Sequence, residues 1–426
     1  MADLSPSKTR RRWRDGLSAL ANRDFLFLWI GSGLDALGTA ILGIALAKLV
    51  YDQTASASGV GLLVFTNWFS MLIVSPLGGV LADRLDRRRL LIGTGILSTA
   101  LVVLFVWLRS PLAAYVLNFV LMSASTLASA ARSAILPDVV ARDQLLDTNA
   151  LQQSLNTLVS ILGPLLGGFV VDRFPALVPF VLCGVIYVLG VLCKLLIRVP
   201  RLPALPGAAT LRGVYDGFVE GLRYARTNPV VSTLTAVFFL VGAGYGLVVG
   251  LDMVFAERVL ANPSIPAAIA YSYLMSASSA GIFVGSLWVR ALGRRFVKKR
   301  LLMASLSTLG IESLLLALVR PLPLVLGIKL ARGVGSGINM TLYPTLLQEN
   351  TTEEHRGRAM SLFLSVASIS PSLTIYLGAW LADRTSVQVV YGLAGVCILL
   401  AVLAGCLLPG FRAIPAYGEG EAAPTV

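Results

Sequence analysis

Long runs of apolar residues, separated by short polar segments, recur along the whole chain. Each run is close to the ~20 residues that an α-helix needs to cross ~30 Å of hydrocarbon. The runs are continuous and lack the period-two alternation of membrane β-strands. They predict an all-α membrane protein with twelve transmembrane helices, at 25–50, 59–82, 89–108, 111–136, 150–171, 175–198, 229–254, 266–289, 301–319, 322–347, 358–381 and 387–409.

Composition agrees with this pattern, since 56% of the residues are hydrophobic and 13% are charged. A soluble domain carries about 25% charged residues, so the excess apolar surface is expected to face lipid. The cysteines lie in apolar runs without a C-x-x-C pair, which argues against a zinc site or a disulfide framework. No G-x-x-x-x-G-K-[ST] loop is present, so neither ATP nor another cofactor is expected.

The net charge is +13, and the basic residues gather at the ends of the apolar runs. They therefore indicate topology rather than nucleic-acid binding. With the N-terminus inside, 26 of the 35 Lys and Arg residues fall in cytoplasmic segments and six in outer segments, while Lys194, Lys329 and Arg332 lie within runs. This bias predicts a multi-pass protein of the inner or plasma membrane with both termini in the cytoplasm. No cleavable signal peptide is evident.

The chain also repeats itself. Asn22 before the first run matches Asn228 before the seventh, and Gly79-x4-Arg84 matches Gly285-x4-Arg290, both at an offset of 206. Six helices are therefore expected to be followed by six more in the same orientation. The expected organisation is a cytoplasmic N-terminal segment (1–24), an N-terminal six-helix bundle (25–198), a cytoplasmic linker with an amphipathic helix (199–228), a C-terminal six-helix bundle (229–409) and a disordered cytoplasmic tail (410–426).

The inner loop between the second and third runs reads Gly78-Gly79-Val80-Leu81-Ala82-Asp83-Arg84-Leu85-Asp86-Arg87-Arg88-Arg89. Gly79 allows close helix approach, and Asp83 can cap the positive N-terminus of another helix. The arginines can pair with a carboxylate such as Asp138. A latch that holds the inner side closed is the favoured interpretation, and topology anchoring is the alternative. The predicted gating residues are Gly79, Asp83, Arg84, Arg87, Arg88 and Asp138.

This loop resembles the signature G-x-x-x-D-R/K-x-G-R-R/K of the major facilitator superfamily, with Asp86 in place of the second glycine. The resemblance implies that Asp83 caps the eleventh span, near Gly357–Met360. A second motif, Gly163-Pro164-Leu165-Leu166-Gly167-Gly168, resembles the GP-x-x-GG end of the motif of exporters in this superfamily, although Val159 replaces an upstream glycine. Pro164 kinks the helix, and an ordinary Pro/Gly kink is the alternative interpretation.

Segments 22–29, 136–145 and 356–361 are similar to the branch that holds macrolide efflux pumps and enterobactin-type exporters. The resemblance implies the major facilitator fold, with two pseudo-symmetric six-helix bundles, and proton-coupled efflux by alternating access. The expected substrate is an amphipathic or cationic small molecule of drug, macrolide or siderophore type. The alternatives are a lipid or lysolipid flippase of the same fold and, from another class, a membrane sensor or intramembrane enzyme. The spans lack a nucleophile–base set, so no enzyme is expected.

Ionisable residues inside the spans are candidates for proton coupling because they are expensive to bury. Asp35 lies about 15 Å into the first span and is the favoured protonation site; a neighbouring hydroxyl or arginine that satisfies it is the alternative. Glu312 and Lys329 flank one turn at equal depth, which predicts an ion pair of structural or coupling role. Arg332 resembles the Arg-x-x-x-Gly motif that this superfamily usually carries in its fourth span, where this chain has Ser125.

Polar and aromatic residues within the spans could face a substrate cavity or hydrogen-bond to other helices. The candidates are Asn67, Trp68, Gln152, Asn156, Tyr245, Tyr273, Asn339 and Tyr343. The expected partners are a small-molecule substrate, protons and the lipid bilayer, without nucleic acid, and the protein is expected to be a monomer.

Overall fold

The computed structural model describes residues 19–108, 110–198 and 211–414. Within these ranges the chain is helical and contains no β-structure apart from an isolated bridge between Asn262 and Ile265. Most of the expected N-terminal segment, the start of the linker and most of the tail lie outside the described residues.

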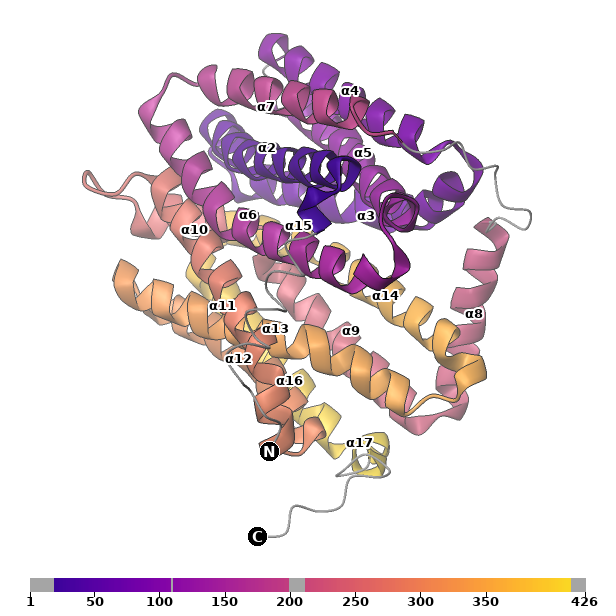
Figure 1. Ribbon diagram of the computed structural model, residues 1–426. Helices are drawn as coiled ribbons and strands as arrows, with labels where there is room; N and C mark the ends of the chain where they lie inside the picture. Colours follow the sequence, from indigo (N-terminus) through magenta and orange to yellow (C-terminus); the bar gives the residue numbers. More distant parts are fainter. Residues whose placement is uncertain (1–18, 109, 199–210, 415–426) are drawn as a thin grey trace, which may run out of the picture.

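The long helices follow the predicted runs closely (Figure 1). The first half contains α2 (Arg23–Thr54), α3 (Ala57–Arg84), α4 (Arg87–Trp107), α5 (Pro111–Val139), α6 (Leu145–Arg173) and α7 (Val178–Leu195). The linker helix α8 (Leu211–Thr227) comes next. The second half contains α9 (Pro229–Val249), α10 (Asp252–Phe255), the π-helix η3 (Ala256–Leu260), α11 (Ala267–Arg295), α12 (Lys298–Leu318), α13 (Leu322–Glu349), α14 (Arg356–Ser372), α15 (Ile375–Arg384), α16 (Val387–Leu407) and α17 (Pro409–Ala413).

Eleven of the described helical segments are long and apolar enough to cross a membrane, with α14 and α15 counted as one. The remaining expected span, 322–347, is the 28-residue helix α13. It is not among the eleven because Lys329, Arg332 and its glycines lower its mean hydropathy. Eleven predicted spans are thus confirmed as candidate membrane helices, and the twelfth stays a prediction.

Two predicted spans are interrupted. The run 358–381 divides at Leu373 and Thr374, just after Pro371, into α14 and α15. The run 229–254 ends as α9 at Val249, and α10 starts at Asp252. Hydropathy does not show these breaks because most of the residues around them are apolar or small.

Large apolar side chains remain exposed along the outside of several helices. On α7 they recur at helical spacing, at Val181, Val185, Val188 and Leu192. On α16 they do the same, at Leu393, Val396, Leu400 and Leu403. A soluble protein rarely exposes continuous apolar surface of this kind. These stripes are the surfaces expected to contact lipid.

The internal repeat of the sequence is visible in the structure as two equivalent helix caps, at Asn22 and Asn228. Asn22 caps α2 by accepting from two amides of its first turn, and it donates to the Val139 carbonyl at the end of α5 (2.8 Å). Asn228 caps α9 in the same way and donates to the Asn350 carbonyl just after α13 (3.1 Å). The first and fourth long helices of each half are therefore joined by the same contact, as the repeat predicts.

Helices α11 and α13 approach each other through glycine. A Cβ atom at any of four positions would overlap the backbone of the opposite helix: Gly281, Gly285, Gly333 and Gly337. The Gly-x3-Gly spacing on each helix places both glycines on one face, where they allow the two backbones to touch. This contact positions α13, which carries Lys329 and Arg332.

Replacing Gly337 by valine is expected to destabilise the protein by about 2–3 kcal/mol, because the new side chain would overlap the Ile282 carbonyl. Gly327→Val is the matched control. It lies on the same helix with no atom within 4 Å of its Cβ position, and it carries the same helix-propensity cost. Thermal unfolding of the purified protein in detergent measures both changes. Equal melting temperatures would contradict the close packing of α11 and α13.

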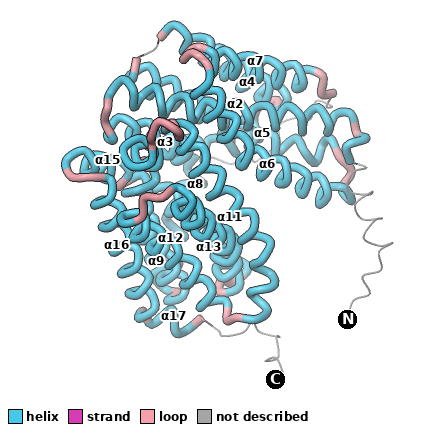
Figure 2. The backbone as a smooth tube through the Cα atoms, turned by 90° about the vertical axis from the view of Figure 1, so that its left-hand side faces the viewer, coloured by secondary structure: helices cyan, strands magenta, loops and turns pink. Residues whose placement is uncertain are grey.

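The two halves meet at one end of the molecule and diverge toward the other (Figure 2). At the end where they meet, α3 lies against α15, and α6 of the first half packs against α11 of the second. This end carries Ser56, Arg258 and Asp383, and we call it the joined end. The polar contacts that hold it are part of the candidate site.

Candidate functional site

The carboxylate of Asp383 connects the two halves at the joined end. It accepts from the Ser56 hydroxyl (2.6 Å) and from the amides of Ala57 (2.7 Å) and Ser58 (2.8 Å). These groups belong to the start of α3, where the first amides have no partner within the helix and the helix dipole is positive. Arg258 of η3 donates to the same carboxylate (3.0 Å). An acid of the second half therefore caps a helix of the first.

Arg258 also reaches the first half directly. It donates to the Tyr51 hydroxyl (3.1 Å) and the Ala55 carbonyl (3.2 Å). Beside it, Glu257 lies 3.5 Å from Lys48. The short η3 helix thus places two charged side chains against the end of α2. Sequence reasoning missed this cluster because its charges sit at the ends of apolar runs, where they serve as topology signals.

The glycines of the 163–168 motif explain how α6 packs on both sides. A Cβ at Gly163 would lie 2.6 Å from the Ala40 side chain, and one at Gly167 would lie 3.1 Å from Ile41 Cα, both on α2. A Cβ at Gly168 would overlap Ser272 of α11. Gly163 and Gly167 therefore allow α6 to pack closely against α2, and Gly168 allows it to pack closely against α11 of the second half. Pro164 is buried between them.

Asp383→Asn is expected to weaken the joined end by about 2 kcal/mol, the cost of losing hydrogen bonds to a charged acceptor. The equilibrium should then shift about 30-fold toward separation of the halves at this end. Spin labels at exposed positions 173 and 264 of a cysteine-free variant measure the shift as longer label-to-label distances. Asp143→Asn, an exposed carboxylate on a distant loop, should leave the distances unchanged. Distances that stay unchanged in Asp383→Asn as well would argue against the capping role.

At the opposite end of α3 lies the predicted gating loop. Arg87 donates to Asp138 (2.7 Å) and to the Ala134 carbonyl (3.0 Å), so the contact suggested by the sequence is present. Arg88 donates to the Leu195 carbonyl (2.8 Å). These contacts join α4 to α5 and α7 within the first half. The side chains of Asp83 and Arg84 and the packing around Gly79 are outside what the structure describes, and the latch stays a prediction.

Asp35 of α2 forms a buried ion pair with Lys194 of α7 (2.5 Å). The Lys194 side chain is 2% exposed and that of Asp35 is 22% exposed. Glycine makes room for both partners. Asp35 Oδ1 lies 2.8 Å from the Cβ position of Gly190, and Lys194 Nζ lies 3.0 Å from that of Gly95. Larger residues at these two positions would displace the pair.

The Asp35–Lys194 pair lines a cavity of about 410 Å³ in the first half, between α2, α4, α5, α6 and α7. Arg132 of α5 lines the same cavity. Hydroxyl groups supply much of the remaining wall. The cavity therefore combines three charged groups with many neutral hydrogen-bonding groups.

A second cluster of buried charges lies in the second half. Lys329 contacts Glu312 of α12 (2.8 Å) and Asp252 of α10 (2.7 Å). Arg332 lies 3.3 Å from the other oxygen of Glu312, and Tyr391 donates to Asp252 (2.6 Å). The side chains of Glu312 and Lys329 are 4% and 5% exposed. The predicted Glu312–Lys329 pair is present as part of a larger network.

Sequence reasoning did not single out Lys194 or Asp252 as site residues. Both are charged residues inside predicted spans, which is the criterion that selected Asp35. Asp252 falls close to the end of its run, where a charge can also be explained by solvent. The criterion could have found both residues if it had been applied to every charge within a span.

Arg332 is linked to the first half through two aromatic rings. Its guanidinium lies over the Tyr245 ring, 5.0 Å from the centroid. Tyr245 in turn meets Trp68 of α3 edge-on, with 6.5 Å between centroids. Cation–π and edge contacts of this kind are individually modest. Tyr245 and Trp68, both predicted cavity residues, thus form part of the contact between the halves.

Other predicted cavity residues have different surroundings. Asn156 lines the 410 Å³ cavity and accepts from Gln152 one turn away on α6 (3.3 Å). Asn67 accepts from Asn118 of α5 (2.5 Å), which is the interhelical hydrogen bond named as its alternative. Only Asn156 of these residues lines the cavity of the first half.

Tyr343 is a core residue and does not line a cavity. It is 1% exposed, and its ring packs against Phe238 and Phe363. A tyrosine within an apolar run has the same sequence pattern whether it faces a core or a cavity. Tyr273 is 40% exposed, and the Asn339 side-chain oxygen is buried without a hydrogen-bond partner.

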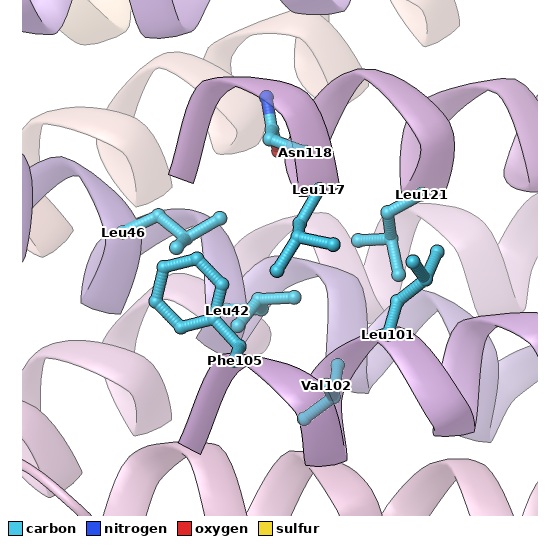
Figure 3. A pocket seen from close by; sticks show the side chains of 8 residues that line it. All are labelled: Leu42, Leu46, Leu101, Val102, Phe105, Leu117, Asn118 and Leu121. Carbon is cyan, nitrogen blue, oxygen red and sulfur yellow. The ribbon is translucent and has the colours of Figure 1, made fainter. Parts of the chain in front are cut away.

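A smaller hollow lies in the first half between α2, α4 and α5 (Figure 3). Its volume is about 10 Å³, which holds one water molecule at most. Asn118 is the polar residue at its edge, and the amide group bonds outward to Thr66 (2.8 Å). The hollow is a packing gap lined by Leu42, Leu46, Leu101, Val102, Phe105, Leu117, Asn118 and Leu121.

Comparison with known sequences identifies a family and several relatives. The model of the Major Facilitator Superfamily matches residues 28–295 and 253–421. The chain is 24% identical over 390 residues to the multidrug efflux pump Tap of Mycolicibacterium fortuitum, covering 88% of this chain and 93% of that protein. It is 23% identical over 394 residues to macrolide efflux protein A of Streptococcus pyogenes, with coverage of 88% and 93%. It is 27% identical over 438 residues to the enterobactin exporter EntS of Salmonella typhi, with coverage of 96% and 99%.

Solved structures share the fold at low sequence identity. The nucleoside transporter NupG matches with a TM-score of 0.74 and 13% identity, covering 90% of this chain and 98% of that one. An auto-inhibited POT family peptide transporter matches with a TM-score of 0.74 and 12% identity, covering 94% and 99%. The expected major facilitator fold is thereby confirmed, while the count of six spans in each half stays a prediction.

Proposed function

Because the chain belongs to the major facilitator superfamily, we propose that this multi-pass membrane transporter exports small amphipathic molecules across the cell membrane by alternating access. The relatives are described as a multidrug efflux pump, a macrolide efflux protein and an enterobactin exporter. They match between 88% and 96% of the chain. Their descriptions support export of a drug-, macrolide- or siderophore-type molecule.

The observation that carries proton coupling is the buried Asp35–Lys194 pair on the wall of the 410 Å³ cavity. A carboxylate inside a membrane span is costly and is a natural point for proton exchange. A proton on Asp35 removes its charge and leaves Lys194 without a counter-charge. The relative stability of the two transport states then depends on that proton, which is the requirement for coupling.

The proposed orientation places both termini in the cytoplasm, as the distribution of Lys and Arg favours. The joined end then faces outward, and the Arg87–Asp138 loop faces the cytoplasm. In this orientation the structure corresponds to a state closed on the outside by Asp383 and Arg258. Export requires these contacts to break while the inner loop closes. The proposed unit of transport is a monomer, because each chain has both halves.

Purified protein in liposomes tests this proposal. Substrate is added from a panel of macrolides, lipophilic cations, siderophores and lysolipids, and an enclosed pH-sensitive dye reports proton movement. Proton movement that depends on one of the drugs or siderophores is the expected result. If lysolipid is the only compound translocated and no proton movement accompanies it, the proposal is wrong and the protein is a flippase.

A further inference from the structure

The two clusters of buried charged residues differ in net charge. In the second half, two acids meet two bases: Asp252 and Glu312 contact Lys329 and Arg332. In the first half, one acid meets two bases, since Asp35 is the carboxylate beside Lys194 and Arg132 on the cavity wall. With all groups ionised, the first cluster carries one excess positive charge and the second carries none.

The excess charge belongs to Arg132. Its guanidinium donates to the Ser129 hydroxyl one turn away (3.2 Å). Across the described residues, no carboxylate lies within ion-pair distance of it, because Asp35 is engaged by Lys194 at 2.5 Å. A guanidinium has five N–H donors in a planar fork. Most of these donors are therefore available on the cavity wall.

The rest of the wall is suited to a negatively charged group. Hydroxyl groups that can donate to an anion lie on the same wall, among them Ser98, Ser125 and Ser129. Arginine binds carboxylate and phosphate groups with two parallel hydrogen bonds, and hydroxyl groups can complete the shell. The volume of about 410 Å³ accommodates such a group together with part of a larger molecule.

We propose that this cavity binds the anionic group of the exported molecule, with Arg132 as its direct partner. The proposal rests on the export function and adds the chemical class of the substrate. A bound anion gives the buried cluster of the first half two negative and two positive charges, which is the balance already present in the buried cluster of the second half. A cationic substrate on Asp35 would instead place a second cation beside Lys194.

Charge movement is consistent with export of an anion in the proposed orientation. The loaded cluster of Asp35, Lys194 and Arg132 is neutral when the ligand moves outward, and the empty cluster carries one positive charge when the first half returns. A membrane potential that is negative inside favours this return step and does not oppose the neutral loaded step. A proton that returns inward on Asp35 adds to the same driving force.

Two dyes that share a xanthene ring system but differ in charge test the proposal directly. Fluorescein is anionic near neutral pH and rhodamine 123 is cationic. Binding to the purified full-length protein in phosphatidylcholine nanodiscs is followed by fluorescence anisotropy, without any transport. The expected result is tighter binding of fluorescein. Equal binding of the two dyes, no binding of fluorescein, or tighter binding of rhodamine 123 would overturn the proposal.

Three variants locate the site. Arg132→Gln should weaken fluorescein binding by at least about tenfold, and Arg132→Lys should restore part of it. Arg320→Gln removes one exposed positive charge far from the cavity and should leave binding unchanged. Thermal unfolding establishes that each variant is folded. Unchanged fluorescein binding in a folded Arg132→Gln protein would also overturn the proposal.

Asp35→Asn separates an anion site from a cation site. It removes a carboxylate that competes with the anion for Lys194 and Arg132, so fluorescein should bind as tightly as before or more tightly. A site built for a cation would instead lose affinity. Binding is measured at equilibrium and does not depend on transport. If fluorescein binding depends on Arg132 but the liposome assay shows no flux, the anion site is supported and the export function is refuted.

The anion could be a free solute or the phosphate of a lipid. Benzoate and phosphatidylglycerol are therefore added separately as competitors of fluorescein. Displacement by benzoate, lost in Arg132→Gln, supports a soluble substrate. Displacement by phosphatidylglycerol alone supports the same anion site with a lipid phosphate as its ligand. Failure of both to displace the dye counts against an anion site.

Discussion

Replacing Asp35 by asparagine is expected to reduce substrate-driven proton flux by about 100-fold, to the background of protein-free liposomes. The amide cannot take up or release the proton. Asp35 is suited to that exchange because its side chain is 22% exposed at the cavity while it remains paired with Lys194. The change is measured with the enclosed pH-sensitive dye, and Asp35→Glu should keep measurable flux because it keeps the carboxylate.

Two further variants make this result interpretable. Asp172→Asn removes an exposed carboxylate at the end of α6 and should leave the flux unchanged. The double variant Asp35→Asn with Lys194→Met removes both charges and avoids an unpaired buried lysine. A folded double variant without flux supports coupling at Asp35. If Asp35→Asn keeps the proton flux of the unchanged protein, Asp35 is not the coupling residue. The cluster around Glu312 would then be the next candidate.

Replacing Lys329 by methionine is expected to destabilise the protein by about 3–5 kcal/mol. Lys329 lies between Asp252 (2.7 Å) and Glu312 (2.8 Å), and its own side chain is 5% exposed. Without it, two buried carboxylates share the single charge of Arg332. The expected result is a large fall in the temperature of unfolding and a smaller fraction of monodisperse protein after purification.

An exposed pair supplies the control for Lys329. Lys298 lies 2.8 Å from Glu349, with side chains 24% and 39% exposed, and Lys298→Met should cost less than about 1 kcal/mol. Adding Glu312→Gln to Lys329→Met should recover part of the lost stability, because one acid and one base then remain. If Lys329→Met were as stable as Lys298→Met, the network would not hold the second half together.

Some long-range features followed from local patterns. The spans are set by apolar runs long enough to cross hydrocarbon, so their positions could be predicted to within a few residues. Glu312 and Lys329 could be paired because they flank a single turn at equal depth. The matching caps at Asn22 and Asn228 could be expected from the repeat, which places equivalent residues in equivalent surroundings.

Other features depend on which helices become neighbours. Hydropathy gives the depth of Asp35 and Lys194 in the membrane but not the direction in which each side chain points around its helix. Their contact, and the place of Arg132 on the same wall, required α2, α5 and α7 to be assembled. Tyr343 was assigned to a cavity for the same reason, since the sequence does not separate a core-facing ring from a cavity-facing one.

The sequence by itself determined the membrane-spanning helices, the duplication of six, the family and one buried ion pair. Those properties depend on residues close together in the chain or on recognisable motifs. Tertiary structure decided the charge balance of each half and the way in which Asp383 and Arg258 join the two halves. These properties arise from contacts between distant segments, and their energies depend on distance and burial, which no linear pattern encodes.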